Sequence, residues 1–136
     1  MEELYDRVNR WSHYSKYLKG NSPFISFIGA PYSGGQQKKG TEKTPNIFRD
    51  TYFFDLVEKE TGLKIVDSGD VKPMETEEVF VEKLPNLKNM IQVSRYCQSL
   101  KEHVHQEIEK GGFSLTIGGD HSIAIGSFFS LYQYIF

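Results

Sequence analysis

The sequence predicts an α/β fold with a mostly parallel sheet. Three short apolar runs rich in β-forming residues, at 24–28, 63–66 and 113–117, have the composition of buried strands. The segments between them carry apolar residues at helical spacing, and glycines stand at most of the boundaries. Strands that alternate with helices are typical of parallel sheets, because each parallel connection needs a long crossover.

The composition limits the class of protein. A chain of 136 residues, with 38% hydrophobic and 25% charged residues, is long enough for one soluble domain with its own core. The net charge of −2 gives no general attraction to nucleic acid or acidic membranes, and no apolar run approaches the ~20 residues that span a bilayer. Cys97 is the only cysteine, which favours a reducing compartment. With no targeting signal at residues 1–3, we expect a cytoplasmic protein that binds neither nucleic acid nor membrane.

Each predicted element has its own residue pattern. Thr44 and Pro45 are typical of an N-cap and a first helical residue, and Gly62 is typical of a helix end. Asn86 can cap a long helix with one apolar face. In chain order we predict a helix at 1–20, a strand at 24–28, a loop at 32–43, a helix at 44–62, a strand at 63–66, a loop at 71–85, a helix at 87–108, a strand at 113–117 and a helix that begins at Ile123.

The glycine-rich loop at 32–43 could cradle a phosphate with its backbone N–H groups. The P-loop pattern requires Gly-Lys-Ser/Thr after a four-residue spacer, and neither Gly29 nor Gly35 leads to that lysine. No G-x-G-x-x-G pattern is present either. We therefore expect a flexible loop, or the rim of a ligand site, rather than a nucleotide loop.

Two histidines, His103 and His105, lie in the predicted helix 87–108. Their side chains diverge by about 200° around a helix, so they cannot chelate one metal ion together. Each has a glutamate four residues later, Glu107 and Glu109, and this spacing predicts ordinary surface pairing.

The strongest candidate site is the stretch Gly-Gly-Asp-His-Ser at 118–122. Paired glycines turn the chain after a strand, and three polar side chains then stand at the carboxyl edge of the sheet, where open α/β sheets bind ligands. One interpretation is that Asp120 or Ser122 only caps the following helix. The other is that His121 is a ligand of a divalent transition metal, with Asp120 or a backbone carbonyl fixing its tautomer. One histidine does not make a metal site, so the pattern alone leaves both interpretations open.

Two stretches together resemble the N-terminal third of arginase, within the family of manganese ureohydrolases. One is Phe-Ile-Gly-Ala-Pro-Tyr-Ser-Gly-Gly-Gln at 27–36, followed by Lys-Gly-Thr-Glu at 39–42. The other is Leu-Thr-Ile-Gly-Gly-Asp-His-Ser-Ile-Ala-Ile-Gly-Ser at 115–127, whose Gly-Gly-Asp-His-Ser motif is specific to the family. The resemblance covers about 24–127 and is weak across 71–87. The first stretch favours arginase over the agmatinase branch.

The resemblance implies a three-layer α/β/α domain, incomplete here with about three strands, that holds two Mn²⁺ ions at the carboxyl ends of its strands. In the family, a hydroxide between the metals attacks the guanidinium carbon of L-arginine and gives L-ornithine and urea. Hard carboxylates with histidine suit Mn²⁺, and two metals can generate hydroxide at neutral pH. His121 matches the manganese-ligating histidine of the motif, and Asp120 is expected to support His121 without contacting the metal ion. Family members are homo-oligomers, typically trimers.

The chain also departs from the family pattern. We expect three parts: a helical extension at 1–20, an arginase-like part at 21–127, and a divergent tail at 128–136 that has five aromatic residues and no charge. The tail is interpreted as a foreign terminus, the alternative being a genuine last helix. The family motifs that carry the other metal ligands, the substrate contacts and the proton shuttle are not found, so no catalytic residue is assigned.

Two expectations follow for the activity of the chain. The first is that the sequence belongs to an arginase but that these 136 residues alone are inactive. The second, from a different class, is a non-catalytic truncated isoform that pairs with full-length subunits through an open sheet edge or its aromatic tail. Another ureohydrolase activity, such as hydrolysis of agmatine, also stays open.

Overall fold

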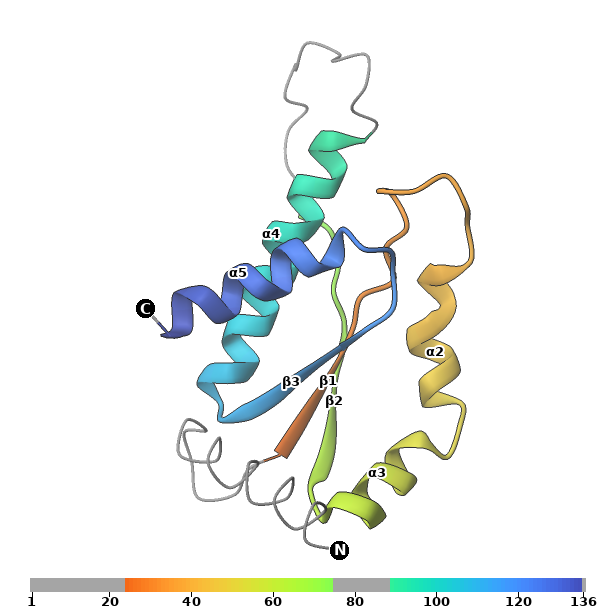
Figure 1. The fold of residues 1–136 in the computed structure, drawn as a ribbon, viewed down its shortest axis with the longest axis vertical. Helices are drawn as coiled ribbons and strands as arrows, with labels where there is room; N and C mark the ends of the chain where they lie inside the picture. The colour runs from red at the N-terminus through yellow and green to blue at the C-terminus, as the bar shows by residue number, and fades with distance from the viewer. Residues whose placement is uncertain (1–23, 75–88, 136) are drawn as a thin grey trace, which may run out of the picture.

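The structure is a computed structural model, and it describes residues 24–74 and 89–135 (Figure 1). The predicted helix at 1–20, most of the predicted loop at 71–85 and the proposed cap Asn86 lie outside the described residues.

Three parallel strands form the sheet, in the order β2-β1-β3. They are β1 (Phe24–Gly29), β2 (Lys64–Asp70) and β3 (Gly112–Ile117). β1 is central, and its first residue pairs with the first residue of each neighbour. The predicted parallel sheet is therefore confirmed. The predicted end of the second strand at Val66 is wrong, because Asp67 and Asp70 still pair with β1 after an irregularity in the register.

In the part of the chain that the structure describes, five helical elements connect or follow the strands. They are the 3₁₀ turn η1 (Thr41–Lys43) and the α-helices α2 (Thr44–Arg49), α3 (Phe53–Thr61), α4 (Met90–Glu109) and α5 (Ile123–Ile135). Within the described residues, no helix has the length and apolar character needed to cross a bilayer.

The predicted single helix at 44–62 is wrong, since the chain breaks at 50–52 into α2 and α3. The Thr51 hydroxyl donates to the Phe48 carbonyl, and a side chain that bonds backward in this way competes with the next helical turn. The predicted start is also shifted. Thr44 is the first helical residue rather than the cap, because its hydroxyl donates to the Thr41 carbonyl of the preceding 3₁₀ turn. The predicted end at Gly62 is confirmed, with φ +70° in the left-handed region that glycine tolerates.

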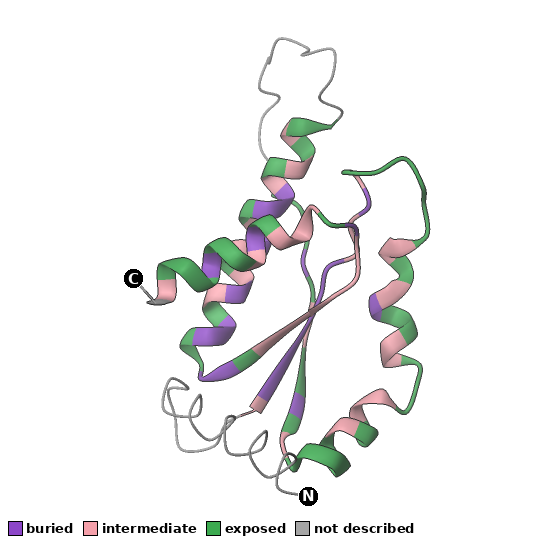
Figure 2. Cartoon of the chain, in the orientation of Figure 1, coloured by how far each residue is buried: buried purple, intermediate pink, exposed green. Residues whose placement is uncertain are grey.

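Helices cover both faces of the sheet, as predicted for a three-layer α/β/α domain (Figure 1). Successive β1 side chains point to opposite faces. Ile25 and Phe27 pack with the α2–α3 side, and Ile28 packs with α4. β1 is almost wholly buried, whereas β3 is only partly covered (Figure 2). The core thus follows the central strand, and the carboxyl ends of all three strands open toward one edge.

Candidate functional site

The turn at 118–122 leads from the carboxyl end of β3 into α5. Gly118 and Gly119 have φ values of +104° and +73°, which favour glycine. A Cβ atom on Gly118 would lie 2.5 Å from the Pro45 ring, and one on Gly119 would lie 2.6 Å from the Tyr32 carbonyl oxygen. The predicted sharp turn is confirmed, and its tightness comes from this close packing against α2 and the loop after β1.

Asp120 joins this turn to two other segments. Its side chain is buried, with the residue 7% exposed. One carboxylate oxygen accepts a hydrogen bond from the Gly35 backbone N–H at 2.8 Å. The other accepts from the Ser122 N–H at 2.9 Å and from the Ser122 hydroxyl at 2.6 Å. The backbone N–H of Asp120 donates to the Tyr32 carbonyl at 2.9 Å. Asp120 therefore satisfies an N–H group at the start of α5, as the capping interpretation predicts, and also holds the loop after β1.

His121 lies between these two anchored residues and is exposed. The Asp120 carboxylate accepts its three hydrogen bonds from Gly35 and Ser122 rather than from the His121 ring. The structure gives no group of three or more His, Cys, Asp or Glu side chains that could hold a metal ion within the described residues. In this part of the chain, the turn thus presents the exposed His121 imidazole, together with an Asp120 carboxylate that already accepts hydrogen bonds from within the fold.

The loop after β1 rims the turn. Gln36 donates to the Thr41 hydroxyl at 3.0 Å, and the Gly40 N–H donates to the Glu42 carboxylate at 2.8 Å. Hydrogen bonds from the backbone of Glu42 itself and from the Gly40 N–H lower the pKa of Glu42. Lys39 approaches the buried Ser33 hydroxyl at 3.5 Å. The loop is thus held by its own side chains, beside the candidate site.

α4 contacts both the turn at 118–122 and the loop after β1. The Tyr32 and Tyr96 rings stack with centroids 4.3 Å apart, and burial raises the pKa of both phenols. The Cys97 thiol donates to the Ser122 carbonyl at 3.2 Å, and burial raises its pKa as well. At the start of α4, the Asn89 side chain donates to the Gly34 carbonyl at 2.8 Å. Packing from α4 therefore holds both the loop and the turn.

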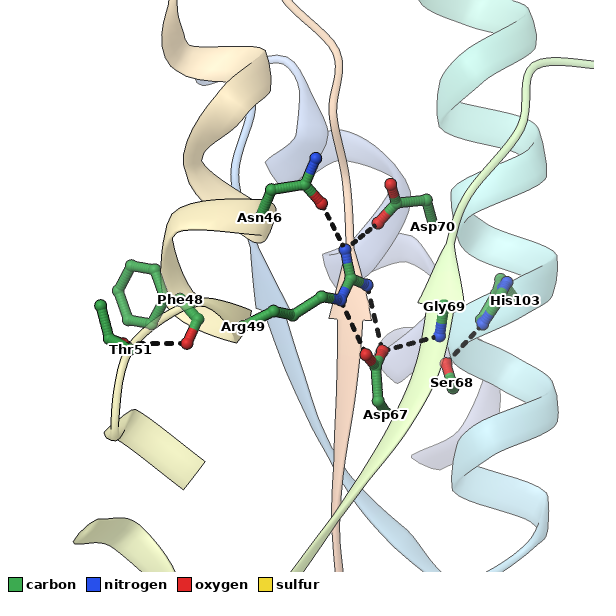
Figure 3. A network of polar contacts seen from close by, with 9 residues as sticks. All are labelled: Asn46, Phe48, Arg49, Thr51, Asp67, Ser68, Gly69, Asp70 and His103. Carbon is green, nitrogen blue, oxygen red and sulfur yellow. Dashed lines mark hydrogen bonds and ion pairs between the residues drawn. The ribbon is translucent and has the colours of Figure 1, made fainter. Parts of the chain in front are cut away.

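A second polar cluster, at the carboxyl end of β2, was not predicted (Figure 3). Arg49 donates to both oxygens of Asp67, at 2.7 and 3.0 Å, and to Asp70 at 2.7 Å. It also donates to the Asn46 side chain at 3.1 Å. These hydrogen bonds, which Arg49 donates and Asp67 accepts, lower the pKa of Asp67 and raise the pKa of Arg49. The cluster ties α2 to β2, and both carboxylates are bonded to the one Arg49 guanidinium. Polar residues after the apolar run of β2 were visible in the sequence, but their partner on α2 was not.

His103 and His105 point to different neighbours, as their spacing predicts. His103 Nε2 lies 2.6 Å from the Ser68 hydroxyl, and the His105 ring packs edge-on against Tyr134.

The predicted surface pairing of Glu107 is wrong, because its side chain is buried between α4 and β1. The Ser26 hydroxyl and the Lys110 ammonium group each donate to it at 2.6 Å. Burial acts to raise the pKa of Glu107, but these two hydrogen bonds outweigh it and lower the pKa. The four-residue spacing from His103 predicted an exposed carboxylate, but Glu107 lies on the buried side of α4 with Leu100, Val104 and Ile108.

Comparison with known proteins places this geometry among the arginases. A family model described as the Arginase family matches residues 24–135. An arginase of Staphylococcus aureus (strain MSSA476) is 36% identical over 104 residues, which is 76% of this chain and 34% of that protein. An arginase of Schizosaccharomyces pombe is 34% identical over 121 residues, covering 88% of this chain and 36% of that protein. The chain spans about a third of the length of the curated relatives it matches.

Solved structures agree with this assignment. The native arginase of Bacillus caldovelox superposes with a TM-score of 0.65 at 30% identity, over 82% of this chain and 37% of that one. The Entamoeba histolytica arginase, solved in complex with L-ornithine, superposes with a TM-score of 0.65 at 20% identity, over 85% of this chain and 38% of that one, and this likeness concerns the fold alone. The family match includes 128–135, part of the tail that the sequence predicted to be divergent, and the boundary at 127 stays a prediction.

Proposed function

The chain belongs to the arginase family, and from this premise we propose that its sequence serves the manganese-dependent hydrolysis of L-arginine to L-ornithine and urea. The observation that carries the proposal is the Gly-Gly-Asp-His-Ser turn at 118–122, held at the carboxyl edge of a parallel sheet. Ligands of open α/β sheets bind at this edge. A cytoplasmic location and a homo-oligomeric assembly are part of the same proposal.

His121 is the residue that we expect to contribute to a manganese site. An imidazole suits a divalent transition metal, and this one is exposed at the edge of the sheet. When bound, a pair of manganese ions supplies hydroxide at neutral pH. Asp120 is assigned a positioning role, because its hydrogen bonds to Gly35 and Ser122 hold the turn that carries His121. The described residues offer one ligand and no cluster of three, so we expect the 136-residue chain alone to release no urea from L-arginine.

A chimaera tests the proposed activity. Residues 24–135 of this chain would replace the matching N-terminal part of the Bacillus caldovelox arginase, which is 33% identical over 103 residues. We expect the purified chimaera to bind manganese and to release urea from L-arginine. Agmatine, assayed in parallel, should be the poorer substrate.

Two variants sharpen this assay. His121→Ala should lower both the manganese content and the rate by at least about tenfold, as loss of a metal-site residue does. Gln106→Ala, on the exposed side of α4, should change neither. A folded chimaera that binds manganese but hydrolyses no arginine would refute the proposed function. Full activity in the His121→Ala variant would refute the role of His121.

A further inference from the structure

The segment formed by η1 and α2 contacts the start of the turn at 118–122. The Pro45 ring is buried against the backbone of Gly118, where a Cβ atom would lie 2.5 Å from the ring. The Thr41 carbonyl, in the 3₁₀ turn that runs directly into α2, accepts the Gly119 N–H at 3.1 Å. The position of this segment therefore sets the position of both turn glycines.

The last residue of α2, Arg49, is anchored on a different strand. Figure 3 shows its side chain extending from α2 across β1 to the end of β2. The guanidinium bonds to Asp67 through Nε and to Asp70 through Nη1, each at 2.7 Å. It also lies over the Phe27 ring of β1, 5.1 Å from the ring centroid. Only a planar group with several N–H donors makes all these contacts at once, so a lysine could not replace it here.

The space between this anchor and the sheet is closed. Gly29 is the last residue of β1, and a Cβ atom there would overlap the Asp70 carboxylate and lie 2.9 Å from Arg49 Nη2. Directly beyond Asp70, the Val71 N–H donates to the Gly29 carbonyl at 2.9 Å. Arg49 and Asp70 therefore rest on the backbone at the carboxyl end of β1, which leaves α2 little room to shift toward the sheet.

α2 depends on such contacts because it is too short to be stable by itself. It has six residues, whereas isolated helices shorter than about 12 residues are marginal in water. No side-chain hydrogen bond caps its start, and Ile47 on its outer side is exposed. Pro45, Phe48 and Arg49 supply its contacts with the rest of the fold. The anchor at Arg49 is thus one of three attachments that place the helix.

We propose that Arg49 is a positioning residue for the candidate site. By anchoring the end of α2 on β2, it fixes Thr41 and Pro45 at the other end of the segment, and these two residues hold the glycines that lead to His121. Arg49 acts through them and takes no part in the reaction. The importance of this for a metal site rests on the proposed function, but the effect on the turn can be measured without any metal ion.

This restraint complements the one that Asp120 supplies. The Asp120 carboxylate bonds to the loop after β1 and to Ser122, so it holds the end of the turn. η1 and α2 hold Gly118 and Gly119, at its start. Loss of the Arg49 anchor should therefore loosen the first half of the turn while the Asp120 bonds remain.

Native-state amide exchange of the 136-residue chain tests this inference. Arg49→Lys keeps the positive charge but loses the planar group that joins the two carboxylates. We expect exchange of the Gly119 N–H to become at least about tenfold faster relative to the amides of β1, as for a local opening. Val57→Ala is the control, because Val57 packs on the same side of the sheet but lies in α3. It should lower stability in urea denaturation without changing that ratio.

The chimaera with the Bacillus caldovelox arginase measures the effect on the metal site. In its Arg49→Lys variant, we expect the manganese affinity, measured by isothermal titration calorimetry, to fall by at least about tenfold, as when a group that orients a metal ligand is lost. Arginine hydrolysis at saturating manganese should return to the rate of the unsubstituted chimaera. Val57→Ala should leave the manganese affinity unchanged, which separates positioning from a general loss of stability.

The outcomes separate this inference from the proposed function. An unchanged relative exchange of the Gly119 N–H in Arg49→Lys, or an equal change in Val57→Ala, would overturn the positioning role. An unaltered manganese affinity in the Arg49→Lys chimaera would overturn it as well. If the unsubstituted chimaera hydrolyses no arginine while the exchange responds as expected, the proposed function fails and the positioning of the turn by Arg49 stands.

Discussion

Among the residues of the candidate site, Asp120 is the one whose replacement should lower the stability of the chain most. Replacing it with alanine deletes the acceptor of three hydrogen bonds, from the Gly35 N–H, the Ser122 N–H and the Ser122 hydroxyl. Two of the three donors are backbone groups that cannot turn toward another partner. The loop after β1 and the start of α5 would then lose their direct connection through this side chain.

The expected cost follows from the environment of each bond. Loss of the contact with Ser122 N–H resembles loss of a helix cap, about 1 kcal/mol. A hydrogen bond to a charged acceptor contributes about 1.5–3 kcal/mol, and the Gly35 contact lies at the low end because Gly35 itself is exposed. The Ser122 hydroxyl can rotate to water and adds little. Asp120→Ala should therefore lower the free energy of unfolding by about 2–4 kcal/mol.

Urea denaturation of the 136-residue chain, followed by circular dichroism at 222 nm, measures this change. Asp120→Asn is the matched variant, because it keeps the size and one carbonyl acceptor while its amide group faces a donor. It should lie between the native chain and Asp120→Ala. A loss below about 0.5 kcal/mol in Asp120→Ala, as for an ordinary surface residue, would refute the assignment of Asp120 as the residue that holds the turn.

Two further predictions concern the packing of the turn and the cluster on β2. Gly118→Ala should destabilise the chain by about 2 kcal/mol more than Gly40→Ala in the same denaturation assay, because both positions have positive φ but only Gly118 meets Pro45; equal losses would contradict this. Arg49→Gln should cost about 1 kcal/mol or less at pH 7, since Asp67 is about a third exposed. Because the pKa of Asp67 is lower in the folded chain than its unfolded value of about 4, the ionised carboxylate stabilises the fold above that value, and this stability is lost as the pH falls through the folded pKa. The stability difference between Arg49→Gln and the native chain should therefore shrink between about pH 5 and pH 2. A constant difference would contradict the assigned cause.

The sequence predicted the elements with strong local signals. The strand around Phe27 and the turn at Gly118 could be predicted because apolar β-formers and paired glycines act locally. The break between α2 and α3 could not, since it depends on the Thr51 hydroxyl finding the Phe48 carbonyl, and the helical pattern continues across it.

The misplaced polar residues share one cause. Glu107 was predicted on the surface from its spacing to His103, yet it is buried, because Ser26 on β1 supplies a partner 81 residues away. The Arg49–Asp67 pair likewise joins two elements that only the folded sheet brings together. A buried carboxylate requires a hydrogen-bond or charge partner nearby. Which residue serves as that partner depends on how the strands and helices are arranged, and not on residues that are close in the sequence.

The arrangement of the turn also bears on the two interpretations of 118–122, which are compatible rather than competing. The fold uses the Asp120 carboxylate and the Ser122 hydroxyl for its own hydrogen bonds. His121 lies between them, exposed, on a backbone that two close-packed glycines and the Asp120 bonds already position. The backbone that carries His121 would therefore need little rearrangement when a metal ion binds. In the proposed metal site, capping by Asp120 would therefore position the backbone that carries His121.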